Sequence, residues 1–176
     1  MNILITLLCI LAGIIVLLLI IAAFTKKEYH THSEIIIDAS REKVFDYLKQ
    51  IKKQDNWNMW VMMDPDMKRE FTGTDGTVGF IYGWNGNKKA GEGEQEIKAI
   101  TEGKNIDMEI RFVRPLAGIA HASMSTASLT DKQTKVTWTS AAKLKYPLNI
   151  MQTMIVKLLE KDMNTSLHTL KNILEK

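Results

Sequence analysis

An unbroken apolar stretch at the N-terminus constrains this chain more than any other feature of its sequence. Residues 3–24 contain no charged residue and no proline, and Lys26 and Lys27 follow directly. At about 1.5 Å of rise per residue such a helix is about 33 Å long, which matches a hydrocarbon layer of about 30 Å. The stretch therefore predicts a membrane-spanning anchor over residues 1–25.

A cleaved secretory signal is the alternative interpretation of this stretch. It would carry basic residues ahead of a shorter apolar run and small residues at its cleavage site. Only Met1 and Asn2 precede the run, and both lysines lie on its far side. Because lysines beside a spanning helix tend to stay in the cytoplasm, we expect a single-pass membrane protein with a cytoplasmic domain.

The remaining residues are enough for one domain with its own core. We expect a linker over residues 26–32 and one domain over residues 33–176. The net charge of +3 is too small to indicate a nucleic-acid partner, and the single cysteine, Cys9, excludes an intramolecular disulfide. The four histidines are scattered without metal-ligand spacing, so we expect neither a metal ion nor another cofactor.

The domain begins with patterns typical of one strand and two short helices. Residues 33–37 are rich in isoleucine and favour a strand. Ser40 has the character of a helix cap, and apolar residues recur on one face of the segment that follows it. Residues 54–63 contain two tryptophans and three methionines and read as a second short helix that runs into a loop.

Antiparallel strands are predicted from residue 67 to residue 143, because short alternating runs are separated there by turn residues. The runs at residues 78–84 and 106–112 place aromatic and apolar side chains on one face. Residues 150–174 have apolar side chains at helical spacing, which predicts a long amphipathic helix. We expect Leu158 to lie on the face of this helix that packs against the sheet.

This order of elements, together with several local motifs, resembles a known superfamily. The motifs are the segment Ala39-Ser40-Arg41-Glu42-Lys43-Val44-Phe45-Asp46-Tyr47-Leu48, the Trp57 to Trp60 segment, residues 79–84 followed by Asn85-Gly86-Asn87, and Thr137-Trp138. They are similar to the START-like helix-grip (SRPBCC) superfamily, and most of all to members described as polyketide cyclases or dehydrases. The resemblance implies an α+β fold in which a curved antiparallel sheet of about seven strands surrounds the C-terminal helix.

Members of this superfamily hold lipids, sterols, hormones or polyketides between the sheet and the helix, so the resemblance implies a cavity here. Carried over by position, its ligand-binding residues are Trp57, Trp60, Phe80, Tyr82, Trp84, Met108, Ile110, Phe112, Met124, Trp138, Met151, Met154, Ile155 and Leu158. Methionine-rich apolar walls suit a hydrophobic or amphipathic small molecule. A closed core filled by the same side chains is the alternative.

No shared catalytic motif carries over, and we expect a binding module rather than an enzyme. Tyr82, Gln95, His121 and Tyr146 are the polar side chains that a cyclase or dehydratase could use to move a proton. Buried Tyr and Gln side chains more often serve only as structural hydrogen-bond partners, so no catalytic residue is assigned. A regulatory membrane protein without a ligand and a cyclase- or dehydratase-type enzyme are the two alternative functions.

Overall fold

A computed structural model describes residues 3–176 of the chain. Its elements are, in chain order, α1 (Ile3–Phe24), β1 (Glu28–Ile37), α2 (Arg41–Leu48), η1 (Ile51–Asn56), α3 (Met59–Met62), β2 (Lys68–Thr72), β3 (Ile81–Asn85), β4 (Glu92–Thr101), β5 (Asn105–Arg114), β6 (Gly118–Thr130), β7 (Gln133–Lys143), η2 (Leu148–Met151) and α4 (Gln152–Leu174).

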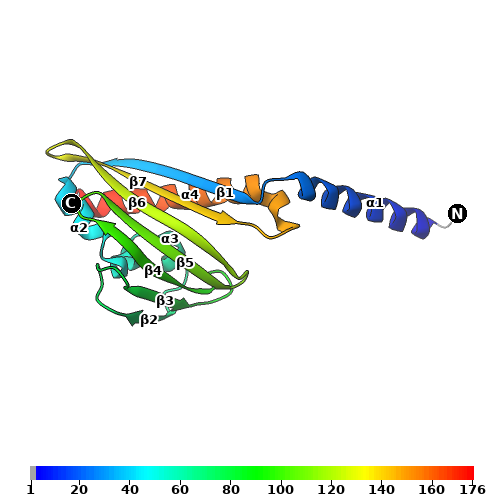
Figure 1. The fold of residues 1–176 in the computed structure, drawn as a ribbon, viewed down its shortest axis with the longest axis horizontal. Coiled ribbons are helices and arrows are strands. Elements are labelled where there is room, and N and C mark those ends of the chain that lie inside the picture. The colour runs from blue at the N-terminus through cyan, green and yellow to red at the C-terminus, as the bar shows by residue number, and fades with distance from the viewer. Residues whose placement is uncertain (1–2) are drawn as a thin grey trace.

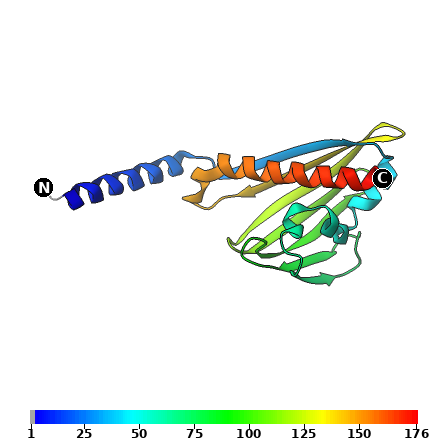
Figure 2. The same cartoon turned by 180° about the vertical axis from the view of Figure 1, so that it is seen from behind.

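The strands form one antiparallel seven-stranded sheet in the order β1-β7-β6-β5-β4-β3-β2. Figures 1 and 2 show that the sheet curves and that α4 runs along its inner side, with α2 and α3 beside it. The predicted helix-grip architecture is therefore confirmed. The expected start of the domain at residue 33 differs from the structure, because β1 begins at Glu28 and pairs with β7 from there.

Local sequence explains the short elements that close the sheet. The Ser40 hydroxyl accepts a hydrogen bond from the Lys43 backbone N–H at 3.4 Å and caps α2. The next turns bury Val44, Phe45 and Leu48 against the sheet. The main core lies beneath them and consists of fully buried side chains from the sheet and from the second half of α4, including Ile37, Phe80, Ile97, Ile106, Met124, Leu167 and Leu170.

The predicted packing face of α4 is wrong in the first half of the helix. Leu158 and Met154 are 57% and 58% exposed, whereas Met163 and Leu167 are buried. Each residue turns the helix by about 100°, so neighbouring positions present different faces. The apolar stripe of this helix is wide enough to divide into a buried face and a solvent-facing face, and sequence spacing alone did not separate the two.

Helix α1 is joined to the domain by side-chain hydrogen bonds as well as by the chain itself. The buried Asn149 Nδ2 donates to the carbonyl oxygens of Ala22, at 2.6 Å, and Thr25, at 2.9 Å. The Tyr146 hydroxyl donates to the Leu19 carbonyl at 3.3 Å. The two bonds from Asn149 supply donors at the end of α1, where the last carbonyl groups of a helix lack intrahelical partners. As a result α1 leaves the domain in a defined direction, away from the start of α4 (Figure 1).

Apart from this junction, α1 is exposed along its length. It is the one helix within residues 3–176 that is long and apolar enough to cross a membrane, with a mean hydropathy of 3.4 over its most apolar window. None of that window is buried by the domain. The helix therefore has the length and surface of an anchor or of a signal sequence, and not those of a core helix.

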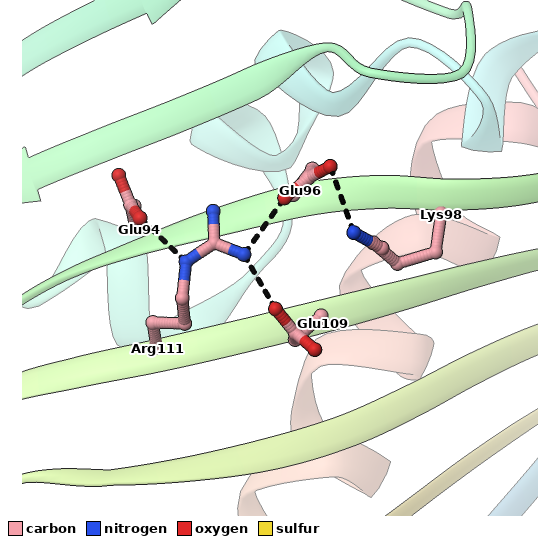
Figure 3. Close-up of polar contacts among 5 residues, drawn as sticks. All are labelled: Glu94, Glu96, Lys98, Glu109 and Arg111. Atoms are coloured by element: carbon pink, nitrogen blue, oxygen red, sulfur yellow. Dashed lines mark hydrogen bonds and ion pairs between the residues drawn. The ribbon is translucent and has the colours of Figure 1, made fainter.

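The outer face of the sheet is polar, as the alternating glutamates of β4 predict. Arg111 on β5 donates to Glu94, to Glu96 at 2.7 Å and to Glu109 (Figure 3). These hydrogen bonds raise the pKa of the guanidinium. The hydrogen bond from Arg111, followed by one from Lys98, lowers the pKa of the Glu96 carboxyl. The network ties β4 to β5 on the side of the sheet opposite α4.

Candidate ligand-binding cavity

A cavity of about 250 Å³ lies between the inner face of the sheet and helices α3 and α4. Most of its walls are apolar. They are formed by Tyr29, Thr31, Gln54, Asn58, Trp60, Val61, Met67, Tyr82, Trp84, Lys89, Ala90, Gln95, Ile110, Phe112, Arg114, Pro115, Ala120, Ala122, Trp138, Ser140, Leu159 and Met163. Lys89, Phe112 and Pro115 are exposed, and we call the opening beside these three residues the mouth.

Two aromatic pairs shape the walls. Trp84 on β3 meets Phe112 on β5 edge to face, with ring centroids 6.0 Å apart. Trp60 on α3 meets Trp138 on β7 in the same manner at 5.5 Å. The indole nitrogen of Trp84 donates to the Ala90 carbonyl at 3.2 Å, and that of Trp60 donates to Asp162 on α4 at 3.1 Å. These bonds fix the ring orientations and leave the apolar ring surfaces facing the space.

Tyr82 is the central polar group of the wall, and its hydroxyl is already engaged. It donates to Asp55 Oδ1 at 2.6 Å and accepts from Arg69 Nε at 3.1 Å. Burial, and then the hydrogen bond to the Asp55 carboxylate, raise the pKa of the Tyr82 phenol. Tyr82 therefore stays protonated at neutral pH, and its one proton is directed away from a ligand.

The mouth has a basic character. Arg114 pairs with Glu92 at 2.7 Å and donates to Asn85 at 2.6 Å. The exposed Lys89 amine has no ion-pair partner within residues 3–176. An acidic group at the mouth would therefore meet one free cation and one that is partly neutralised.

Comparison with known protein families shows which family the domain belongs to. The family described as "Polyketide cyclase / dehydrase and lipid transport" matches residues 29–175. The chain belongs to this family. The match covers the whole domain from β1 to the end of α4 and leaves out α1.

Solved structures with the same fold come from distant proteins. Truncated norcoclaurine synthase from Thalictrum flavum superposes with a TM-score of 0.65 at 13% identity, covering 86% of this chain and 97% of that one. A protein from Chromobacterium violaceum gives a TM-score of 0.61 at 12% identity, with coverages of 84% and 97%. One from Nitrosospira multiformis gives 0.59 at 17% identity, with coverages of 83% and 96%. No curated protein matches the sequence.

The cavity of this polyketide cyclase/dehydrase-family domain includes part of the set expected from the sequence. Six expected residues contribute to its walls: Trp60, Tyr82, Trp84, Ile110, Phe112 and Trp138. Four others are buried in the core and do not line the cavity: Trp57, Phe80, Met108 and Met124. The α4 residues Met151, Met154, Ile155 and Leu158 also lie outside it, and Leu159 and Met163 take their place.

The residues that leave the space open were not anticipated from the sequence. Ala120 and Ala122 on β6 and Ser140 on β7 face the cavity, and their small side chains do not fill it. A signal was present, because β6 places Ala120, Ala122 and then Met124 at successive inward positions. Small residues at inward positions of neighbouring strands indicate a hollow where large ones would indicate a filled core.

The polar candidates for chemistry divide between the two faces of the sheet. Tyr82 and Gln95 line the cavity, and the Gln95 amide nitrogen lies 3.0 Å from Met108 Sδ. His121 lies instead on the outer face, in an open hollow of about 580 Å³ that it shares with His30 and His32. Among residues 3–176 no cluster of histidine, cysteine and acidic side chains could hold a metal ion.

Proposed function

We propose that this protein is a membrane-anchored binding protein whose domain holds a compact amphipathic molecule in the cavity. The observation that carries the proposal is the cavity itself, with its aromatic walls and a basic mouth. Apolar pockets with a few placed polar groups are the usual form of a small-molecule site.

The volume limits what the cavity can hold. About 250 Å³ exceeds the ~150 Å³ of an apolar cavity that takes up benzene and is below the ~300 Å³ at which pockets for drug-sized ligands begin. A one- or two-ring aromatic molecule or part of one acyl chain fits this range. A whole lipid with two chains does not.

Charge favours an acidic group on that ligand. Its apolar body would contact Trp84, Ile110 and Trp138, and its acidic group would lie at the mouth beside Lys89 and Arg114. A carboxylate or phosphate buried deeper would be desolvated without a free cation to compensate it. Lipid-like acids and acidic polyketide-like aromatics are therefore the proposed ligand classes.

A relative of the same fold supports the size range, and the wall chemistry favours binding over catalysis. Norcoclaurine synthase from Thalictrum flavum has been solved with dopamine and hydroxybenzaldehyde, at 13% identity to this chain. In the present cavity the Tyr82 proton is directed to Asp55, so the best-placed polar group is unsuited to proton transfer to a ligand.

Saturable binding tests this proposal. The full chain in nanodiscs is titrated with cis-parinaric acid, and energy transfer from the cavity tryptophans to the bound probe is recorded. We expect saturation in the micromolar range, about −8 kcal/mol. The variant Ala120→Leu fills the cavity and should weaken binding by about tenfold, about 1.4 kcal/mol.

Asn164→Leu adds bulk at an exposed position in the second half of α4, outside the cavity, and serves as the matched control. It should bind the probe as the parent chain does. Equal, non-saturating signals from all three chains would reflect only partition into the lipid and would refute the ligand-binding proposal.

For the anchor, we propose that α1 spans the bilayer once with the domain in the cytoplasm. Lys26 and Lys27 follow the apolar helix directly and resist transfer across the bilayer. Protease added outside right-side-out vesicles should leave the domain intact. Digestion of the domain from outside would refute this orientation, and a mature chain that starts near residue 25 would refute the anchor.

A further inference from the structure

A set of exposed apolar side chains lies beside the mouth of the cavity. We call it the apolar rim, and it consists of Leu116, Met151, Met154 and Leu158. Leu116, at 62% exposed, and Leu158, at 57%, are among its most accessible members. Soluble surfaces rarely gather so many large apolar groups without a partner to cover them.

The rim comes from two segments that also form the cavity. The β5–β6 turn contributes Leu116 next to the lining residue Pro115, and α4 contributes Leu158 next to the lining residue Leu159. Met151, Met154 and Leu158 are three and four positions apart, so they form one stripe on the helix. Figures 1 and 2 show both segments toward the end of the domain from which α1 leaves.

Charge at this end of the domain is mainly positive, although Glu28 at the start of β1 is acidic. Residues 140–159 contain three lysines and no acidic residue, and Lys26 and Lys27 lie at the end of α1. Lysines next to a membrane are attracted to the anionic lipids of the cytoplasmic leaflet, each by about 1 kcal/mol. This surface thus combines exposed apolar groups with flanking lysines, the composition of a surface that contacts lipid.

The junction with α1 holds the rim in place. Asn149 lies two residues before Met151 and donates to two carbonyl oxygens at the end of α1. The Gln152 side chain, on the first turn of α4, donates to the Glu28 carbonyl at 3.0 Å. The segment that carries part of the rim is therefore bonded to the residues that leave the bilayer, and a flexible tether does not separate them.

We propose that the apolar rim docks onto the surface of the bilayer that α1 spans, so that the mouth of the cavity opens at the lipid. This inference rests on the proposed membrane anchor. Its consequence is that the cavity exchanges its ligand with the adjoining leaflet and not with bulk water. The bilayer, and not a second copy of the chain, is the occupant because the rim is continuous with the anchor and flanked by lysines.

Site-specific quenching by lipid tests the docking. The native Cys9 in α1 is the one cysteine of the chain, so Cys9→Ser provides a background for single labels. An NBD fluorophore is attached at Cys9 in the parent chain, at Leu116→Cys in the rim, or at Leu129→Cys. Leu129 is an exposed leucine, 49% accessible, at the opposite end of β6 and serves as the matched control.

The full chain is reconstituted at low density in vesicles of phosphatidylcholine and phosphatidylglycerol, with and without doxyl-labelled lipid. We expect the Leu116 label to have blue-shifted emission and to lose most of it to the doxyl lipid, whereas the Leu129 label keeps its emission. Met154→Cys is a second rim position that should behave as Leu116→Cys does, and circular dichroism verifies that each variant is folded.

Each of the other outcomes shows whether the anchor or the docking is wrong. An unquenched Cys9 label would mean that α1 is not in the bilayer, and the anchor and the docking would both be wrong. A quenched Cys9 label with Leu116 as unquenched as Leu129 would overturn the docking alone. A blue shift at Leu116 that grows with protein density and is insensitive to doxyl lipid would assign the rim to a second copy and would also overturn the docking.

Discussion

At the scale of single residues, the space in the cavity comes from side chains that are small and not from those that are large. The tryptophans form walls, but Ala120, Ala122 and Ser140 leave the volume between them unfilled. Tyr82 contributes rigidity more than chemistry, because both its donor and its acceptor functions are satisfied by Asp55 and Arg69. Among the cavity-lining residues that the structure describes, Lys89 alone carries a charge without an ion-pair partner.

Removing the Lys89 amine should weaken the binding of acidic ligands selectively. Lys89→Ala should lower the affinity for cis-parinaric acid by about fivefold, as expected for an exposed ion pair of about 1 kcal/mol. The corresponding alcohol, titrated by the same energy-transfer measurement, should bind both chains equally. Lys88→Ala is the neighbouring control, because Lys88 is exposed and does not line the cavity. An equal loss for acid and alcohol would contradict a charge contribution from Lys89.

Residue-level prediction from the sequence was successful where alternation in a strand decides the face. Tyr82, Trp84, Ile110 and Phe112 were expected to face inward and do so. What alternation does not reveal is how deep an inward residue lies, so Phe80 and Met124 were expected at the cavity and are found in the core. Depth depends on the curvature of the sheet and on where α3 covers it, and the sequence of a single strand determines neither.

At the scale of elements, α4 has two apolar faces, of which one is buried in the core and the other is exposed. The second half of the helix buries Met163, Leu167 and Leu170 in the core, while Met154 and Leu158 near its start face outward. The element was predicted from its spacing and its bounds are close to the expected ones. Which face of α4 is buried was not predicted, because both faces carry an apolar stripe and only the position of the helix over the sheet distinguishes them.

A leucine-to-alanine substitution should affect stability differently on the two faces of α4. Leu167→Ala should lower the free energy of unfolding by about 2–5 kcal/mol, because Leu167 is fully buried. Leu158→Ala should change it by less than about 0.5 kcal/mol. Denaturant titration of the full chain in mild detergent, followed by tryptophan fluorescence, measures both. Similar losses from the two variants would contradict the division of faces.

The β4–β5 pair should make stability depend on pH through its charge network (Figure 3). Hydrogen bonds from Arg111 and then Lys98 lower the pKa of Glu96 below its ordinary value of 4.5. A lowered folded pKa stabilises the fold at pH values above 4.5, and this stabilisation is lost as the pH falls through the folded value. The parent chain should therefore lose stability on acidification in this window.

Replacing the arginine should reduce that loss or reverse it. In Arg111→Met the three carboxylates of Glu94, Glu96 and Glu109 would repel one another at neutral pH, and protonation would relieve the repulsion. Denaturant titrations at a series of pH values from neutrality to about 3 compare the two chains. Parallel pH profiles for the parent and the variant would contradict a role for the network in stability.

At the scale of the whole molecule, the junction between α1 and the domain sets how the cavity is presented. The apolar run of α1 and the order of the elements along the chain were evident in the sequence, but the junction was not. It depends on Asn149, whose polar side chain lies in an apolar stretch and bonds to Ala22 and Thr25 from more than a hundred positions away. Residues 28–32 were expected to be a linker and belong to β1 instead, which shortens the connection.

Breaking the junction should loosen the domain relative to α1. Spin labels at the native Cys9 and at Leu129→Cys should give one narrow distance distribution in nanodiscs, and adding Asn149→Ala should broaden it. Asn164→Ala, at an exposed position of α4, is the control and should leave the distribution narrow. A distribution that is already broad with Asn149 present would show that the junction does not hold.

Native mass spectrometry of the full chain shows whether a small amphipathic molecule occupies the cavity. The parent chain and the Ala120→Leu variant are purified from their own host in mild detergent and released in the gas phase. We expect the parent chain to carry an additional compact acidic molecule in stoichiometric amount, and the variant, with its cavity filled, to carry none. A parent chain that is detected only at its bare mass, or an identical bound mass on both chains, would show that the cavity does not hold such a molecule.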